Sequence, residues 1–207
     1  MNFKKEVVKF SILLEQKGFV NAMEGNISAY DRENSILYIS PSGKAKLFLD
    51  EDVIAVINAE GDQIEGTLKR SSEYLLHQAV YEARPDCNGA IHCHCPYLTA
   101  YAVCQKPFRM DYYPEFLAMF GEIPVQPFGL PGTPDIHENI NKLLEKSNIV
   151  LLANHGVICV GKDIEEAAKL LEAAEAAAHV NALARQLGDP VTLSEDVFQL
   201  ITSLFAK

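Results

Sequence analysis

The chain has 207 residues, enough for one full-sized domain with its own core, and we expect a single domain over residues 1–207. Its 28 acidic and 18 basic residues give a formal net charge of -10 at pH 7, which argues against nucleic acid and anionic membrane surfaces as partners. No apolar stretch is long enough to cross a bilayer and no signal-peptide pattern is present, so we expect a cytoplasmic protein. Five cysteines without regular spacing favour reduced thiols over a disulfide framework.

The first half of the chain predicts a helix, strands, a second helix and a further strand. Apolar residues at helical spacing predict a helix over residues 3–17. Short β-rich runs separated by turn residues predict antiparallel strands between residues 26 and 57. Ser71-Ser72-Glu73 opens a helical pattern that stops before Pro85, which places Glu73 in the first turn of that helix. Residues 89–95 are typical of a strand.

The second half predicts three more helices and a hairpin. Proline at the first helical position predicts helices over residues 96–104 and 133–146. Residues 149–152 and 157–160 are predicted strands joined by a tight turn. A capping-box pattern opens a long Ala-rich helix over residues 163–188. Helices interleaved with antiparallel strands indicate an α/β or α+β fold with a mixed sheet.

Candidate metal ligands occur in the strand 89–95. In the run His92-Cys93-His94-Cys95 the period of two places both histidines on one face and both cysteines on the other. His155 in the hairpin turn and Glu73 at the helix start are the third and fourth candidates. Three histidines and a carboxylate suit Zn²⁺ or a similar ion, and a carboxylate that leaves the metal can act as a base. The alternative, a turn histidine and a carboxylate that complements the helix dipole, stays open on the residues alone.

The other thiols and histidines are weaker candidates. Cys93 and Cys95 lack a second cysteine pair for a closed zinc site, so we expect them to pack as small hydrophobes. His77, His137 and His179 lie within predicted helices, where we expect structural roles.

Three short segments are rich in hydrogen-bond donors. They are Gly25-Asn26-Ile27-Ser28, Ser40-Pro41-Ser42-Gly43 with Lys44, and Ser71-Ser72. If they converge, their backbone N–H groups and hydroxyls form a cradle for the phosphate of a metabolite. Each segment taken alone is better explained as an ordinary turn or helix cap. Walker and dinucleotide-binding signatures are absent.

The motifs Gly-Asn-Ile-Ser, Ser-x-Ser-Gly, Ser-Ser-Glu, His-x-His and Asn-His-Gly, in this order, resemble the class II aldolase/adducin family over most of the chain. Within the family the chain is most similar to the aldolases of L-fuculose 1-phosphate. The resemblance implies a three-layered α/β fold with a central mixed, mainly antiparallel sheet flanked by helices. It also implies a homotetramer with active sites at subunit interfaces and a small phosphorylated sugar as substrate.

The resemblance also assigns roles to individual residues. It implies one Zn²⁺, or another divalent transition metal, per subunit, with Glu73 as both a labile ligand and the catalytic acid/base. The other metal ligands are His92, His94 and His155, and the substrate phosphate is assigned to Gly25, Asn26, Ser42, Gly43, Ser71 and Ser72. Tyr113 is the catalytic tyrosine expected to reach a neighbouring subunit's site, with the adjacent Tyr112 as the alternative.

The reaction implied is that of a zinc-dependent class II aldolase, a lyase. It reversibly cleaves a ketose 1-phosphate such as L-fuculose 1-phosphate to dihydroxyacetone phosphate and an aldehyde through a metal-stabilised enediolate. Dehydratases of the methylthioribulose-1-phosphate type, decarboxylases and 4-epimerases on the same scaffold are the alternatives, although the 4-epimerases carry Ser-Ser-Asp where this chain has Ser-Ser-Glu. The chain departs from the aldolase pattern with serines for threonines at Ser40 and Ser42 and with no tyrosine after Leu193.

Overall fold

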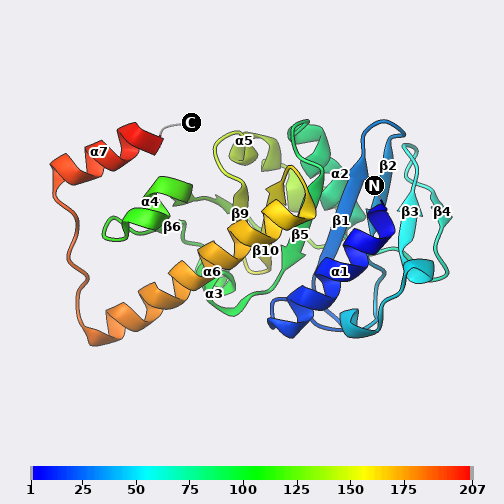
Figure 1. The fold of residues 1–207 in the computed structure, drawn as a ribbon, viewed down its shortest axis with the longest axis horizontal. Coiled ribbons are helices and arrows are strands. Elements are labelled where there is room, and N and C mark those ends of the chain that lie inside the picture. Colours follow the sequence, from blue (N-terminus) through cyan, green and yellow to red (C-terminus); the bar gives the residue numbers. More distant parts are fainter. Residues whose placement is uncertain (1, 206–207) are drawn as a thin grey trace.

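An eight-stranded sheet runs through the centre of the computed structural model, which describes residues 2–205 (Figure 1). Its strand order is β4-β3-β2-β1-β5-β10-β9-β8, and β6 and β7 form a separate two-stranded sheet. The strands are β1 (Asn26–Asp31), β2 (Ile36–Ile39), β3 (Ala55–Ile57), β4 (Gln63–Glu65), β5 (Gly89–Cys93), β6 (Phe108–Arg109), β7 (Glu122–Ile123), β8 (Val125–Gln126), β9 (Ile149–Leu152) and β10 (Gly156–Gly161).

Helices cover both faces of the large sheet. They are α1 (Phe3–Gln16), α2 (Tyr74–Ala83), α3 (Pro96–Val103), α4 (Pro114–Phe120), α5 (Ile140–Leu144), α6 (Ile164–Leu187) and α7 (Glu195–Phe205), with 3₁₀ turns at Lys46–Phe48, Glu51–Val53 and Pro134–His137. Helices α1, α3 and α6 pack on one face, while α2 and α5 pack on the other. The three-layered α/β fold predicted from the sequence is therefore confirmed.

The period of two along the central strands divides the core between the two faces. In β10, Val157 and Cys159 belong to the core under α1, α3 and α6, whereas Ile158 and Val160 belong to the core under α2 and α5. All neighbouring strands of this sheet pair antiparallel except β8 and β9, which are parallel. The sheet is thus mixed and mainly antiparallel, as expected.

The long helix α6 begins with the predicted capping box. Asp163 Oδ1 accepts the backbone N–H of Glu166 at 2.8 Å, and Glu166 Oε2 accepts the backbone N–H of Lys162 at 2.7 Å. The first bond satisfies a donor that the first turn of a helix leaves without a partner, and the second ties Glu166 to the backbone just before the N-cap residue. The helix ends at Leu187, before Gly188, where the sequence predicts its end.

The helix predicted over residues 133–146 is wrong in one respect, because the structure interrupts it. A 3₁₀ turn over Pro134–His137 is followed by α5, and between them Asn139 adopts φ -110° and ψ 9°. This bridge conformation, which interrupts the α-helical hydrogen-bond ladder, separates the two short elements.

The cysteines behave as the composition indicates. All five are free thiols, and four of them are buried, Cys104 being the exposed one. Cys93 and Cys95 lie in the core as predicted.

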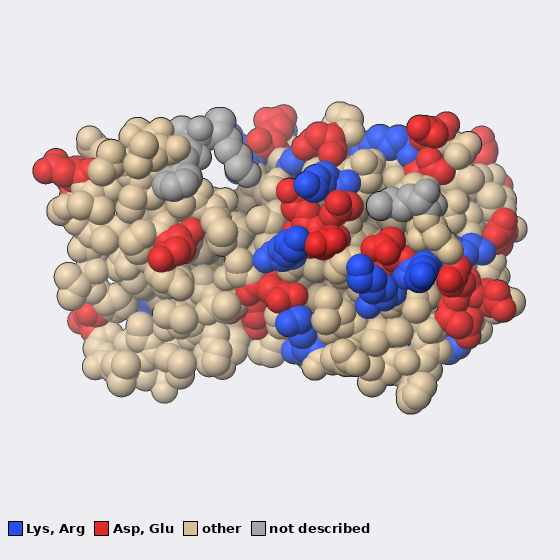
Figure 2. Space-filling view, in the orientation of Figure 1, with Lys and Arg blue, Asp and Glu red and all other residues tan. Residues whose placement is uncertain are grey.

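No helix within residues 2–205 is both long and apolar enough to pass through a membrane. Figure 2 shows that charged side chains on this face gather over α1 and the start of α6, while the part built by α4 and α7 is largely uncharged.

Candidate metal centre and active site

Three histidines meet where β5 ends beside the β9–β10 turn. His92 is fully buried in β5, opposite Asn26 of β1 and Ile158 of β10. His94 follows the end of the strand, and His155 lies in the turn. Their arrangement confirms the face alternation predicted for the strand, because the neighbouring cysteines point into the core.

The turn brings His155 close to His94 because of the residues on either side of it. Asn154 has a left-handed φ of 56°, which asparagine tolerates better than most residues. A Cβ at Gly156 would lie 2.5 Å from the carbonyl oxygen of Cys93 and 2.7 Å from His94 Cδ2. Only glycine permits this approach, which explains the Asn-His-Gly motif.

The ring nitrogens of the three histidines are arranged as a ligand set. One nitrogen from each ring lies within 4.8 Å of the other two, and His92 Nε2 is 3.2 Å from His94 Nε2. His92 Nδ1 donates to the carbonyl oxygen of Val157 at 2.9 Å, which leaves the Nε2 lone pair facing the cluster. Burial lowers the pKa of His92 to about 3, so the ring is neutral, as a metal ligand must be.

This donor set fits a divalent transition metal. Two nitrogens bound tetrahedrally to Zn²⁺ at about 2.0–2.1 Å lie about 3.4 Å apart, close to the separation of the two Nε2 atoms. The bare Nε2 lone pair of His92 also faces Glu73 Oε2 at 3.3 Å. A lone pair opposite a carboxylate is repulsive unless a cation or a proton lies between them.

Glu73 completes the cluster from the N-terminus of α2. Its Oε1 is 3.2 Å from His155 Nε2, and its Oε2 accepts a hydrogen bond from Asn26 Nδ2 at 2.7 Å. Burial raises the pKa of the Glu73 carboxyl, but the positive charge that His92 carries when protonated at low pH, together with hydrogen bonds to His155 and Asn26, holds this pKa well below its usual range. The carboxylate is therefore ionised and positioned against the imidazoles of His92 and His155.

A buried hydrogen-bond relay orients the amide of Asn26. Asn26 Oδ1 accepts from His77 Nε2, so the amide nitrogen is the group that faces Glu73. His77 Nδ1 lies 2.6 Å from Ser28 Oγ, which is 2.7 Å from the hydroxyl of Tyr81. His77 was expected to be structural, and the structure gives it a part in positioning Asn26. The available sequence signal was its spacing, one helical turn after Glu73.

The three donor-rich segments converge on a cavity of about 390 Å³ beside the histidines. Its lining includes Glu73, His94 and His155. All six residues assigned to the substrate phosphate also line it: Gly25, Asn26, Ser42, Gly43, Ser71 and Ser72. The backbone N–H of Ser42 donates to the carbonyl oxygen of Lys69 at 3.1 Å, which holds the Ser-Pro-Ser-Gly segment against the helix start.

Two residues of these segments, Ser40 and Lys44, bind elsewhere and not in the cavity. One residue that lines the cavity, Lys46, is not among the predicted site residues. Ser40 Oγ accepts the backbone N–H of Ile27 at 3.1 Å, and Lys44 Nζ lies 3.9 Å from Asp50 Oδ2. Neither residue lines the cavity, whereas Lys46 does. No local sequence signal predicts a place for Lys46 in the cavity wall.

The candidate tyrosines lie at the start of α4 and outside the cavity lining. The hydroxyl of Tyr112 donates to Asn181 of α6, whereas Tyr113 is half-buried and packs against the core. The chain therefore does not bring either tyrosine to its own histidine cluster.

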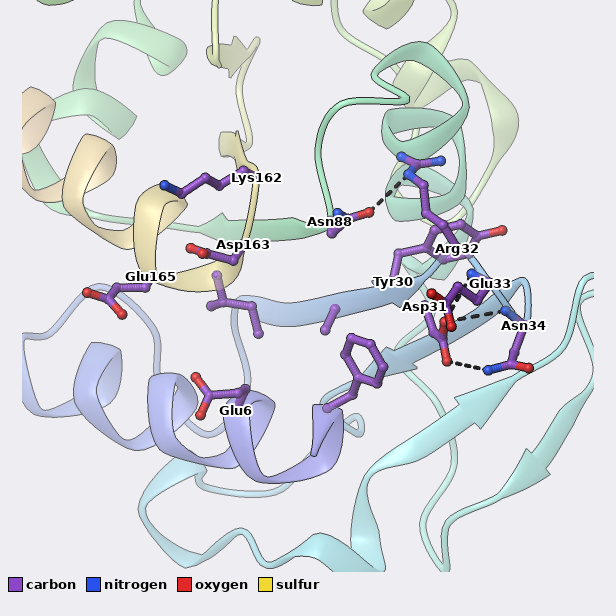
Figure 3. Close-up of a pocket in the computed structure, with 13 residues that line it drawn as sticks. Glu6, Tyr30, Asp31, Arg32, Glu33, Asn34, Asn88, Lys162, Asp163 and Glu165 are labelled. Carbon is purple, nitrogen blue, oxygen red and sulfur yellow. Dashed lines mark hydrogen bonds between the residues drawn. The ribbon is translucent and has the colours of Figure 1, made fainter. Parts of the chain in front are cut away.

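A larger cavity, of about 770 Å³, lies where the β1–β2 turn meets the loop that enters α6 (Figure 3). Figure 3 shows Glu6, Asp31, Glu33, Asp163 and Glu165 around it. None of its described lining residues is a histidine or a cysteine. The cavity beside the histidines is therefore the candidate active site despite its smaller volume.

A family model and individual known proteins match this chain over most of its length. A family model described as the class II aldolase and adducin N-terminal domain matches residues 5–182. The chain is similar to 5-deoxy-D-ribulose 1-phosphate aldolase from Bacillus thuringiensis serovar kurstaki, with 28% identity over 98% of this chain and 94% of that protein. It is also similar to 3-oxo-tetronate 4-phosphate decarboxylase from Pectobacterium atrosepticum, with 30% identity over 83% of this chain and 80% of that protein.

A solved structure of an L-fuculose 1-phosphate aldolase superposes with a TM-score of 0.88 and 29% identity, covering 100% of this chain and 97% of that one. The family match spans most of the chain and includes the segments that bring Glu73, the histidines and the glycine-serine cavity together. The chain belongs to the class II aldolase and adducin family.

Proposed function

We propose that this chain is a metal-dependent aldolase that reversibly cleaves a ketose 1-phosphate, such as L-fuculose 1-phosphate, to dihydroxyacetone phosphate and an aldehyde. The observation that carries the proposal is the position of Glu73, which contacts His92 and His155 and also lines the donor-rich cavity. We further propose that it works as a cytoplasmic homotetramer with one metal ion per subunit.

His92, His94 and His155 would hold Zn²⁺ or another divalent transition metal, with Glu73 as a labile ligand. When bound there, the ion supplies Lewis-acid stabilisation of negative charge on substrate oxygens. The backbone N–H groups and hydroxyls of the cavity bind the phosphate, which fixes the ketone end of the substrate.

Glu73 is the proposed acid/base at the carbon next to the carbonyl group. His92, His155 and Asn26 hold its pKa low in the free site, so the carboxylate gains basicity when a substrate displaces its contacts with the two imidazoles. Asn26 keeps one carboxylate oxygen in place during the proton transfer. Tyr113 of a neighbouring subunit is the proposed proton donor and acceptor at the aldehyde oxygen.

A decarboxylase or dehydratase acting on a related sugar phosphate is the second candidate. The observation in its favour is the similarity to a 3-oxo-tetronate 4-phosphate decarboxylase, at 30% identity. Product analysis separates the reactions, because only an aldolase converts its substrate into two carbon fragments without loss of water or CO₂.

Proton exchange into dihydroxyacetone phosphate tests the aldolase proposal without knowledge of the aldehyde. The purified protein is incubated with dihydroxyacetone phosphate in D₂O, and the hydroxymethyl protons are followed by NMR with and without a chelator. We expect exchange of one hydroxymethyl hydrogen that the chelator abolishes. A metal-loaded protein that shows no exchange would contradict the aldolase proposal and favour the decarboxylase and dehydratase.

A further inference from the structure

Lys46 is a buried lysine in the wall of the candidate active site. It opens the 3₁₀ turn Lys46–Phe48, is only 2% exposed and lines the cavity that contains Ser42, Gly43 and the start of α2. Lysine is almost never fully buried without a partner, because removing the ammonium group from water is costly. Within residues 2–205, however, no hydrogen bond or salt bridge joins the Lys46 ammonium group to another residue, and only burial and the charges of Glu15 and Glu73 act on its pKa.

The two carboxylates whose negative charge acts on Lys46, those of Glu15 and Glu73, have other partners. Glu15 and Glu73 attract the Lys46 ammonium group, but neither forms a salt bridge with it. Glu15 Oε2 accepts the backbone N–H of Leu47 at 2.5 Å, and Glu73 is held by Asn26 and the histidines. Burial lowers the pKa of Lys46 from its ordinary value, so the chain stabilises the charged form incompletely.

Among the described residues that line the cavity, Lys46 is the one lysine or arginine. The residues assigned to the phosphate offer neutral donors, namely backbone N–H groups, serine hydroxyls and one amide, while Glu24 and Glu73 add negative charge. A phosphate dianion in this cavity would be repelled by both carboxylates. A buried ammonium group would offset that repulsion, and charge-assisted hydrogen bonds to phosphate are about twice as strong as neutral ones.

We propose that Lys46 is the charged ligand of the substrate's phosphate group and makes the site selective for phosphorylated over uncharged sugars. The proposal rests on the proposed function only in requiring a phosphorylated substrate. It explains why an unpaired lysine is buried at this position.

Binding of inorganic phosphate tests the proposal directly. Titration calorimetry on Lys46→Met and Lys46→Arg compares the dissociation constants with that of the wild type, and Lys44→Met is the matched control because Lys44 lies in the same segment outside the cavity. We expect Lys46→Met to weaken phosphate binding by about tenfold or more, Lys46→Arg to recover part of it, and Lys44→Met to change it less than about twofold. The thermal midpoint of Lys46→Met should equal or exceed that of the wild type, since the variant removes an unpaired buried charge.

The exchange reaction of dihydroxyacetone phosphate gives a second measurement. We expect Lys46→Met to raise KM at least as much as it weakens phosphate binding, with a smaller effect on kcat. A fall in kcat with unchanged KM and unchanged phosphate binding would overturn the proposal, because Lys46 would then act on Glu73. Undetectable phosphate binding by the wild type, or equal binding by Lys46→Met, would also overturn it. The wild type could also catalyse no exchange but bind phosphate, with weaker binding by Lys46→Met. In that case the aldolase proposal fails and the role of Lys46 stands.

Discussion

The two oxygens of Glu73 face different partners, which suits the proposed roles of metal ligand and base. Oε1 lies 3.2 Å from His155 Nε2, while Oε2 lies 3.3 Å from His92 Nε2 and accepts from Asn26 at 2.7 Å. The carboxylate can leave one imidazole and stay held by Asn26. A group that moves a proton needs this partial freedom, whereas a purely structural ligand does not.

Replacing Glu73 with Gln is expected to abolish proton transfer while the metal stays bound. The amide has the shape of the carboxylate but cannot accept a proton, so exchange of dihydroxyacetone phosphate should slow by about 10²–10⁴-fold. Three histidine ligands remain, so metal content measured on the purified variant should match that of the wild type. An unchanged exchange rate would exclude Glu73 as the base.

At the scale of secondary-structure elements, the buried carboxylate of Glu175 links helix α6 to helix α3. Cys95, the residue before α3, offers no side-chain cap. Glu175 of α6 supplies it instead, because its Oε1 accepts the backbone N–H of Tyr97 at 2.8 Å and its Oε2 accepts that of Leu98 at 2.9 Å. Since only Cys95 separates His94 from α3, this cap also fixes the position of the candidate ligand His94.

Glu175→Gln is expected to lower the free energy of unfolding by about 1–3 kcal/mol, because the amide accepts only one of the two N–H groups and leaves the other unpaired in the core. Glu172→Gln is the matched control on the same helix, where Glu172 is 37% exposed and forms a surface salt bridge with Lys17. The control should lose less than about 0.5 kcal/mol. Urea denaturation of both variants measures the difference, and equal losses would refute the capping role.

Elements with local signals were predictable from the sequence. The capping box at Asp163 marks the start of α6, and Asn154 and Gly156 mark the tight turn, since each residue type there answers a backbone requirement. The period of two placed His92 and Cys93 on opposite faces, which depends only on strand geometry. The predicted helix over residues 133–146 failed because a single non-helical residue, Asn139, has no strong local signature.

Long-range partners could not be predicted in the same way. Three features depend on residues that lie tens of positions apart in the chain. They are the burial of Lys46, the cap that Glu175 provides for α3, and the contact between His77 and Asn26. Their sequence neighbours carry no trace of these contacts. The candidate site was nevertheless predicted in outline, because its motifs are short and each occupies one turn or strand end.

At the scale of the whole molecule, the region of α4 and α7 exposes apolar side chains that the proposed tetramer could cover. It is largely uncharged on the face shown in Figure 2, and Met119, Leu200 and Leu204 are exposed there. Tyr113 begins α4 but is not part of its own chain's cavity lining. This separation supports the proposal that Tyr113 acts in the site of a neighbouring subunit.

Mixed oligomers test that proposal in the intact protein. Glu73→Gln and Tyr113→Phe should each be inactive in cleaving the ketose 1-phosphate that the wild type uses. Refolding them together in equal amounts should restore about a quarter of wild-type activity, because in a head-to-tail ring one site in four pairs an intact Glu73 with a neighbour's intact Tyr113.

A mixture of Glu73→Gln with His94→Ala is the control. Both changes fall in the part of the site that one chain supplies, so no mixed oligomer contains an intact site and no activity should return. Sedimentation velocity at micromolar concentration must show tetramers in every mixture. Complementation requires one chain to complete the site of another. The proposed shared role of Tyr113 would therefore be contradicted by any of three results: recovery of activity in the control, no recovery in the test pair, or a monomeric wild type.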